Sequence, residues 1–136
     1  MKKLLLFLFM IIPIFCFSQN FSNSFTKVET VSFITKIIKP KGNTGSLSSV
    51  GTKVSYTENY YDITTRIKYD LNLADVKIKK SVSKVVLECK SGKCILKNTA
   101  SHDKKEEEHI SSLEFNTDSP TELYKAFLHL KTVVGL

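Results

Sequence analysis

The fold is decided by a stretch in the middle of the chain that reads YDITTRIKYDL, from Tyr61 to Leu71. Large or β-branched residues at every second position alternate there with charged or polar residues. A period of two is that of an extended strand, whose successive side chains point to opposite faces of a sheet. The stretch therefore predicts one long strand with a buried face and a wet face. The buried face is expected to carry Tyr61, Ile63, Thr65, Ile67, Tyr69 and Leu71.

Shorter strands are expected on both sides of this stretch, so that the middle of the chain forms antiparallel β-structure. Apolar residues mark five of them, which makes about six strands in all. These residues are Val54 with Tyr56, Val76 with Ile78, Val85 with Leu87 and Cys89, Ile95 with Leu96, and Leu113 with Phe115. Two segments have the composition of loops: the glycine- and serine-rich residues 41–51 and the charged residues 102–108.

A helix is expected at the end of the sequence, with signals at both of its ends. Ser119 is a suitable N-cap, Pro120 suits the first helical position, and Glu122 completes a capping box with Ser119. Gly135 supplies a C-terminal stop. Between these signals runs an apolar stripe that is expected to cover the core, and two lysines are expected on the outward face. The stripe comprises Leu123, Phe127, Leu130 and Val134, and the lysines are Lys125 and Lys131.

Residues 26–39 fit two structures. Thr26 and Glu29 form a capping box, which favours a helix. The segment is also rich in β-branched residues, which favours a strand. We favour the helix and leave the strand open. The helical stripe would comprise Val28, Val31, Ile34, Ile37 and Ile38, and the strand face Val31, Phe33 and Ile37.

The pattern as a whole predicts an α+β fold that is mainly antiparallel β. A curved sheet or partly open barrel of about six strands would be capped by the C-terminal amphipathic helix. The helix needs such a surface, because an isolated helix of this length is marginal in water.

The first eighteen residues have the three parts of a secretory signal peptide. Lys2 and Lys3 are followed by an apolar run, and Ser18 suits the position before the scissile bond. The run is too short for a membrane-spanning helix, which needs about 20 apolar residues. We therefore expect cleavage after Ser18, a mature chain that begins at Gln19, and a periplasmic or secreted protein.

Lipidation of Cys16 is the alternative to this cleavage. It is disfavoured because Ile14 and Phe15 stand where a lipoprotein signal has small residues. With residues 1–18 removed, the remaining 118 residues suffice for one domain. We divide them into a helix or strand with a loop over residues 19–52 and a β domain with the C-terminal helix over residues 53–136.

The mature chain is basic through lysine. Losing Lys2 and Lys3 lowers the sum of Lys and Arg from 20 to 18 against 13 Asp and Glu, so the net charge falls from +7 to +5. Arg66 is the only arginine. The planar arginine fork suits phosphate and base recognition better than lysine does. The composition therefore disfavours nucleic acid as a partner and leaves weak association with anionic envelope surfaces open.

The most specific local motif is Cys89-Lys-Ser-Gly-Lys-Cys94. With Ser91-Gly92 as a two-residue turn, Cys89 faces Cys94 across a hairpin, in a pair whose side chains are close enough for a disulfide. In an oxidising compartment this pair is expected to be bonded. The same register predicts a core-facing side comprising Val85, Leu87, Cys89, Cys94 and Leu96, with Val86 and Ile95 pointing the other way.

Two other roles for these cysteines fit the sequence less well. A redox-active pair normally has two intervening residues at a helix start, whereas four separate these. A zinc site using Cys89, Cys94, His102 and His109 lacks the usual spacing, because six residues separate the two histidines. We retain the structural disulfide, and we predict no metal and no cofactor.

The chain also resembles a known group of proteins. Antiparallel strands, a tight hairpin and one final helix resemble the pleckstrin-homology-like fold. Three motifs are similar to those of small exported bacterial proteins of unknown function: Leu73-Ala-Asp-Val76, the six residues from Cys89 to Cys94, and Ala126-Phe-Leu-His-Leu130. The resemblance implies a pleckstrin-homology-like domain over residues 53–136 and no activity. Phosphoinositide binding is not implied, because the sequence has no matching arginine-bearing phosphate loop.

No catalytic residues are predicted. His102, His109 and His129 are scattered, and Ser101-His102-Asp103 are sequence neighbours, whereas the groups of a triad converge from separate elements. Five tyrosines could line a ligand surface, although tyrosines on strands more often belong to the core with a wet edge: Tyr56, Tyr60, Tyr61, Tyr69 and Tyr124. We expect a non-catalytic module that binds a ligand or protein partner. The alternatives are an enzyme of unfamiliar type and a structural envelope or secretion-accessory protein.

Overall fold

The computed structural model describes residues 20–61 and 64–136. The expected signal peptide (residues 1–18) and the expected mature N-terminus at Gln19 lie outside the described residues, as does Ile63 in the predicted long strand. The described residues form an α+β fold with two α-helices and eight antiparallel strands, in two sheets that do not close into a barrel. The expected fold class is therefore confirmed, with eight strands in place of about six.

The strands divide into a sheet of five and a sheet of three, in the orders β1-β2-β3-β6-β7 and β4-β5-β8. Helix α1 (Lys27–Ile37) precedes them, and helix α2 (Pro120–Val133) follows them. A 3₁₀ turn, Leu73–Asp75, links β3 to β4. The strands are β1 (Thr44–Val50), β2 (Lys53–Asn59), β3 (Arg66–Asn72), β4 (Val76–Lys80), β5 (Lys84–Cys89), β6 (Ile95–Ala100), β7 (Lys105–Ile110) and β8 (Ser112–Asn116).

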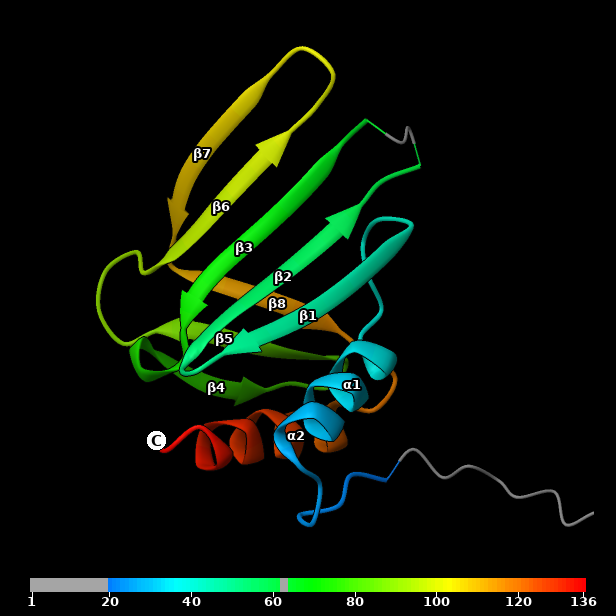
Figure 1. The fold of residues 1–136 in the computed structure, drawn as a ribbon, viewed down its shortest axis with the longest axis vertical. Coiled ribbons are helices and arrows are strands. Elements are labelled where there is room, and N and C mark those ends of the chain that lie inside the picture. Colours follow the sequence, from blue (N-terminus) through cyan, green and yellow to red (C-terminus); the bar gives the residue numbers. More distant parts are fainter. Residues whose placement is uncertain (1–19, 62–63) are drawn as a thin grey trace, which may run out of the picture.

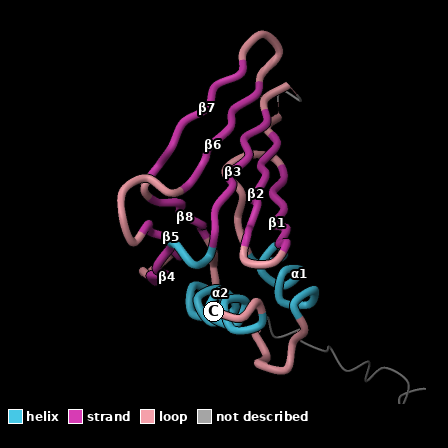
Figure 2. Tube along the Cα trace, turned by 60° about the vertical axis from the view of Figure 1, so that its left-hand side comes forward, coloured by secondary structure: helices cyan, strands magenta, loops and turns pink. Residues whose placement is uncertain are grey.

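The two sheets meet along one corner of the molecule and diverge from it (Figure 1). The chain passes between the sheets three times at this corner, from β3 to β4, from β5 to β6 and from β7 to β8. Backbone hydrogen bonds tie these crossings together. The N–H of Cys89 donates to the carbonyl of Ser111 and that of Lys90 to the carbonyl of Asp75, both at 2.8 Å. Helices α1 and α2 pack against each other below the five-stranded sheet (Figure 2).

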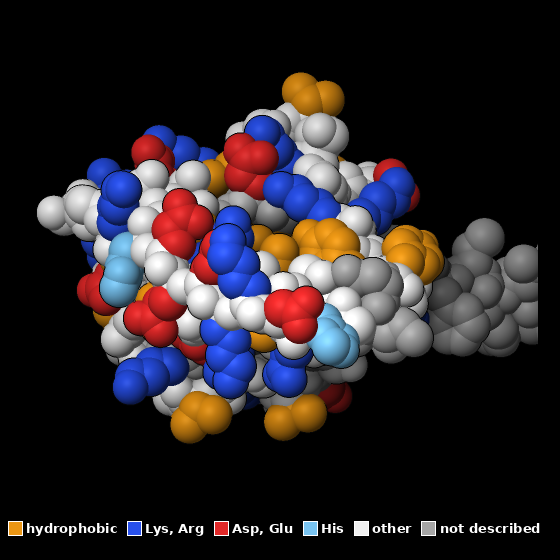
Figure 3. Space-filling view, turned by 90° about the horizontal axis from the view of Figure 1, so that it is seen from above, with side chains coloured by type: hydrophobic (Ala, Val, Ile, Leu, Met, Phe, Trp, Pro, Cys, Tyr) orange, Lys and Arg blue, Asp and Glu red, His pale blue; other side chains and the backbone are white. Residues whose placement is uncertain are grey.

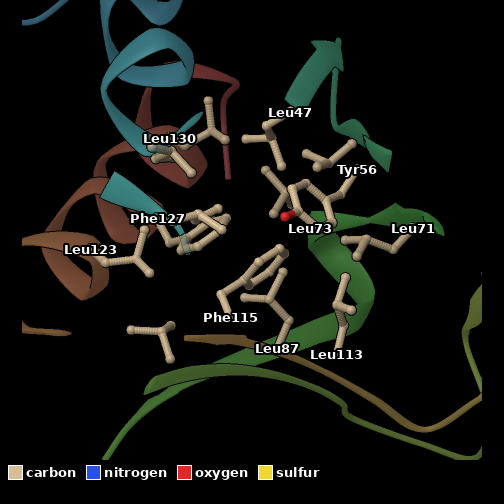
Figure 4. Packing of buried hydrophobic residues seen from close by; sticks show 14 of the residues in the cluster. Leu47, Tyr56, Leu71, Leu73, Leu87, Leu113, Phe115, Leu123, Phe127 and Leu130 are labelled. Carbon is tan, nitrogen blue, oxygen red and sulfur yellow. The ribbon is translucent and has the colours of Figure 1, made fainter. Parts of the chain in front are cut away.

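The core lies between the two sheets and the helices (Figure 4). The ring of Phe115 in β8 lies 4.9 Å from that of Tyr56 in β2 and 5.3 Å from that of Phe127 in α2, centroid to centroid. This cluster therefore joins both sheets and α2. The prediction that the C-terminal helix covers the core is confirmed. Of its expected stripe, Leu123, Phe127 and Leu130 are fully buried and Val134 is half-buried.

Helix α1 occupies the segment that also fitted a strand. The Thr26 side chain accepts a hydrogen bond from the N–H of Glu29, and the Glu29 carboxylate accepts one from the N–H of Thr26, so the expected capping box is present. Ile34 and Ile37 are buried, whereas Val28, expected in the same stripe, is exposed. The helix ends at Ile37, and Pro40 follows shortly after, where it disfavours helix at the residue before it.

The prediction of loops over residues 41–51 and 102–108 is wrong, because both segments contribute to edge strands of the five-stranded sheet. Residues 44–50 form β1 and residues 105–110 form β7. An edge strand is held by backbone pairing to one neighbour, so it needs few apolar side chains. Leu47 is the buried side chain of β1, and the charged side chains of β7 are exposed. Charges along an edge hinder pairing with another chain.

The predicted long strand is also shorter than expected. Strand β3 begins at Arg66. The N–H of Tyr60 donates to the carbonyl of Thr65 at 3.0 Å, so residues 60–65 connect β2 to β3 and do not extend the strand. Tyr61 is 80% exposed and does not belong to the core. The alternation from residue 67 onward is that of the strand, with Tyr69 and Leu71 buried.

The residues before α1 are docked on α2. The N–H of Phe21 donates to Oε2 of Glu122 at 2.6 Å, and Nε2 of His129 lies 2.8 Å from the carbonyl oxygen of Phe25. Because a carbonyl can only accept, this nitrogen of His129 carries a proton. Glu122 therefore does not form the expected capping box, and the Ser119 side chain makes no capping hydrogen bond.

The end of α2 differs from the prediction at one lysine. Gly135 has φ of +90°, the left-handed conformation expected of a C-terminal stop. Lys131, however, is half-buried and does not face outward: its Nζ donates to the carbonyl of Val76 at 2.5 Å. The reason is that the last turn of α2 passes over the start of β4. Lys125 is exposed as expected.

Candidate functional site

Cys89 and Cys94 lie at disulfide bonding distance, with 2.11 Å between the sulfur atoms and 5.7 Å between the Cα atoms. The bond joins the end of β5 to the start of β6, and so it links the three-stranded sheet to the five-stranded sheet. Gly92 in the loop has φ of +60°, a conformation that favours glycine. The disulfide thus closes one of the three crossings at the corner of the fold.

The prediction that β5 and β6 form a hairpin around this bond is wrong. Strand β5 pairs with β4 and β8, and β6 pairs with β3 and β7. The amide hydrogens of Cys89 and Lys90 are taken by Ser111 and Asp75, so the ladder of a hairpin cannot form between the cysteines. The predicted facing also fails on the β6 side, because Ile95 is fully buried and Leu96 is only half-buried.

The histidines do not converge with the cysteines. His102 lies at the exposed turn after β6, with its Nδ1 2.8 Å from Oδ1 of Asp103, whereas Cys94 lies before the other end of β6. His109 is exposed on β7, and His129 is bonded to the segment before α1. Within residues 20–61 and 64–136, no three His, Cys, Asp or Glu side chains are grouped so that they could hold a metal ion.

A buried carboxylate, that of Glu58, organises one group of tyrosines. Glu58 is 5% exposed, and its oxygens accept from the hydroxyl of Tyr60 at 3.1 Å and from the N–H of Lys41 at 3.3 Å. The hydroxyl of Tyr56 is buried, and in the part of the chain that the structure describes it has no hydrogen-bond partner. A Cβ atom at Gly45 would overlap this hydroxyl, so the glycine provides its space.

The environment of these phenols keeps them protonated. Burial and, after it, the charge of Glu58 raise the pKa of Tyr56 and Tyr60, and they raise the pKa of Tyr69 to about 12. At neutral pH these groups are therefore donors and not bases. Tyr56 and Tyr69 belong to the core, whereas Tyr61 is exposed. The five tyrosines thus do not form one ligand surface.

The side chains that do converge line an open pocket of about 430 Å³ beside the disulfide, which we call the disulfide pocket. The register of β2 and β3 places Lys53 opposite Asn72 and Ser55 opposite Asp70. Paired residues share a face, so these four side chains lie together on the outer face of the five-stranded sheet. Asp75 of the 3₁₀ turn and Cys94 complete the polar lining.

The hydrogen bonds of the disulfide pocket leave two charges available. The hydroxyl of Ser55 bonds to Oδ1 of Asp70, and Nζ of Lys68 lies 3.4 Å from the same oxygen. The side chain of Asn72 accepts from the N–H of Ala74 at 3.0 Å and fixes the 3₁₀ turn. Among the described residues, neither Lys53 nor Asp75 has an ion-pair partner. The pocket can therefore offer an ammonium group and a carboxylate to one small molecule.

Sequence reasoning missed this set of residues. Lys53 and Ser55, like Asp70 and Asn72, stand two apart on the wet faces of their strands, so the alternation contains the signal. The sequence does not show, however, that β2 pairs with β3 in the register that places the two pairs of residues side by side.

Comparisons with known protein families, with curated proteins and with solved structures found no match to this chain. Among the described residues, neither α1 nor α2 has the length and apolar character that a helix needs to cross a bilayer.

Proposed function

We propose that the chain is an exported, non-catalytic binding module that holds a small zwitterionic or hydroxyl-rich molecule in the disulfide pocket. The observation that carries this proposal is the convergence of Lys53, Asp70 and Asp75 around one open pocket. An ammonium and carboxylates in one pocket complement a ligand with an anionic group and with hydroxyl or ammonium donors. Amino acids and amino sugars have this chemistry.

Export is the first part of the proposal. It is supported by the three-part N-terminus and by a disulfide, which persists in oxidising compartments. Intact-mass analysis of protein recovered from an expressing bacterium tests it. We expect a chain that begins at Gln19, with or without cyclisation to pyroglutamate. Retention of residues 1–18, or a diacylglyceryl adduct on Cys16, would contradict the proposal.

The absence of catalysis is the second part. Ser55 is the hydroxyl nucleophile of the pocket lining, and it bonds to Asp70. Activation of a serine normally requires a base such as histidine beside it. The described lining of the pocket includes no histidine, and the three histidines of the chain lie elsewhere. These positions support binding over an enzyme of unfamiliar type.

A pleckstrin-homology-like architecture for residues 53–136 is the third part. Two antiparallel sheets and a C-terminal helix support it at the level of layers. Superposition on an experimental structure of a pleckstrin-homology-like protein tests it. We expect both sheets and α2 to superpose, and a failure of either sheet to do so would contradict this part of the proposal.

Thermal denaturation in the presence of small molecules tests the ligand class. The probes are single amino acids, amino sugars and, as a chemical contrast, aliphatic alcohols. We expect at least one zwitterionic or amino-sugar probe to raise the melting temperature of the wild type, since a ligand that binds only the folded state stabilises it. Asp75→Asn combined with Lys53→Ala should abolish the shift, because these are the two charges of the pocket without an ion-pair partner among the described residues.

The matched control combines Glu107→Gln with Lys105→Ala, which removes one charge of each sign from exposed positions on β7. This control should shift like the wild type. An equal shift in the pocket variant, or no shift with any charged probe, would contradict the proposed function.

A further inference from the structure

The loop closed by the disulfide and the end of α2 both lie beside the start of β4, and these three segments carry four lysines. The course of the three segments can be followed in Figure 1. Two adjacent carbonyls at the start of β4 hold these segments together. The N–H of Lys90 donates to Asp75 at 2.8 Å, and Nζ of Lys131 donates to Val76 at 2.5 Å. Lys77 follows Val76 in β4, and Lys93 lies in the loop with Lys90. We call Lys77, Lys90, Lys93 and Lys131 the lysine corner.

The lysine corner has a local excess of positive charge. Within the residues that the structure describes, none of its four ammonium groups forms an ion pair. Glu88, which faces Lys77 across the strand pair, is already bound by Lys79. Burial and, after it, the nearby charge of Lys90 lower the pKa of Lys131, as is typical of a cation without a counter-charge.

The opposite end of the molecule is different. Seen from above, acidic side chains lie among the lysines (Figure 3). Lys104, at the turn between β6 and β7, pairs there with Glu106. At this end of the molecule, the positive charge is thus partly balanced by neighbouring carboxylates, unlike that of the lysine corner.

An exposed aliphatic side chain lies beside the lysine corner. The N–H of Leu136 donates to the carbonyl of Lys131 at 2.9 Å, and the Leu136 side chain is 48% exposed. Lysines beside exposed aliphatic groups suit a membrane interface, where the ammonium groups meet phosphates and the aliphatic groups enter the headgroup layer. A soluble polyanion satisfies the lysines but offers no such layer.

We propose that the lysine corner binds the phosphate headgroups of an anionic membrane leaflet. Lysine, a point charge without the arginine fork, suits many weak contacts with a fluid surface better than bidentate recognition of one group. The inference rests on the export part of the proposed function, which places the protein beside an envelope membrane. It does not depend on the ligand of the disulfide pocket.

Vesicle co-sedimentation tests the proposal with protein recovered from an expressing bacterium. One set of vesicles contains phosphatidylcholine alone, and the other contains phosphatidylcholine mixed with phosphatidylglycerol. The wild type should bind the second set, and binding should weaken as salt is added. Lys90→Ala with Lys93→Ala should weaken it about 30-fold, or about 2 kcal/mol, because each lysine near an anionic leaflet contributes about 1 kcal/mol.

The matched control is Lys36→Ala with Lys105→Ala, which removes the same charge from exposed positions on α1 and β7. The control should bind like the wild type, and both variants should melt like it. Any contribution of residues 1–19 is the same in all three proteins. Because purified protein is used, a failure of export does not affect the result.

Three outcomes would overturn the proposal. The wild type could fail to bind phosphatidylglycerol vesicles, or the control could lose as much affinity as the lysine-corner variant. Alternatively, soluble polygalacturonate could bind the wild type as tightly as the vesicles do. The last result would assign the lysine corner to an acidic polysaccharide.

Discussion

The backbone N–H of Phe21 and the carboxylate of Glu122 form a hydrogen bond of 2.6 Å across 101 positions of sequence. It joins the segment before α1 to the first turn of α2. The rings of Phe21, Phe25 and Phe33 pack beside it with centroid distances of 5.3 to 5.8 Å. The N-terminal segment is therefore part of the folded domain and is held by an acidic side chain of the C-terminal helix.

Glu122→Ala should release this segment. Hydrogen bonds to charged groups contribute about 1.5–3 kcal/mol, so we expect the free energy of unfolding to fall by about 2 kcal/mol. The amide hydrogen of Phe21 should exchange faster with solvent. Glu107→Ala, an exposed glutamate on β7, is the control and should change stability by less than about 0.5 kcal/mol. Unchanged exchange at Phe21 would show that Glu122 does not hold the segment.

Phe127→Ala should remove the contact between α2 and Phe115. Truncation of a fully buried phenylalanine costs about 3–5 kcal/mol, which is comparable with the whole stability of a small domain. Urea denaturation measures this loss. Lys125→Ala is the control, because Lys131 bonds to Val76 and is not a neutral position. Equal midpoints for Phe127→Ala and Lys125→Ala would mean that the stripe does not pack on its own sheets.

Replacing Cys89 and Cys94 by serine should lower the free energy of unfolding by about 2 kcal/mol. In the chain-entropy model, a short closed loop restricts the unfolded state by about this amount. The free energy of unfolding of the serine variant should equal that of the reduced wild type and be lower than that of the non-reduced wild type. Mass analysis of exported, non-reduced protein provides the direct check, and two free thiols in that material would refute the bond.

Alkaline pH should destabilise the protein partly through Tyr69. Its pKa is raised from 10.0 to about 12 in the folded state, so the folded protein retains a proton that the unfolded chain loses. The stabilisation is complete below pH 10.0 and is lost as the pH rises toward 12. Tyr69→Phe should therefore flatten the fall in stability across this window.

Tyr61→Phe, at an exposed position, is the control for this titration. Lys131 titrates in the opposite sense because its pKa is lowered, but it is present in both variants. Urea denaturation at several pH values gives the slopes. Identical slopes for Tyr69→Phe and Tyr61→Phe would contradict the prediction.

The helices were predictable because their signals are local. The capping box of Thr26 and Glu29 and the stripe of α2 depend only on neighbours along the chain. Strands β4, β5 and β8 also carry their own apolar alternation. By contrast, β1 and β7 are made of small polar or charged residues, and pairing at a sheet edge gives such segments no local signal.

Strand pairing was the main source of error. Cys89 and Cys94 are brought close by a hairpin and equally by a corner between two sheets, so the cysteine spacing cannot tell these apart. The disulfide pocket was missed for the same reason. Lys53 and Asn72, like Ser55 and Asp70, become neighbours only through the register of β2 with β3, a contact between distant parts of the sequence.

The three crossings between the sheets also have a mechanical consequence. Because Cys89 bonds to Ser111 and Lys90 bonds to Asp75, backbone hydrogen bonds join the two sheets directly at these crossings. If the two sheets move relative to each other, the connection between β6 and β7 should be displaced more than the residues at the crossings. Asn72, Asp75 and Cys94 lie at these crossings. We therefore expect the disulfide pocket to keep its shape when the two sheets move relative to each other.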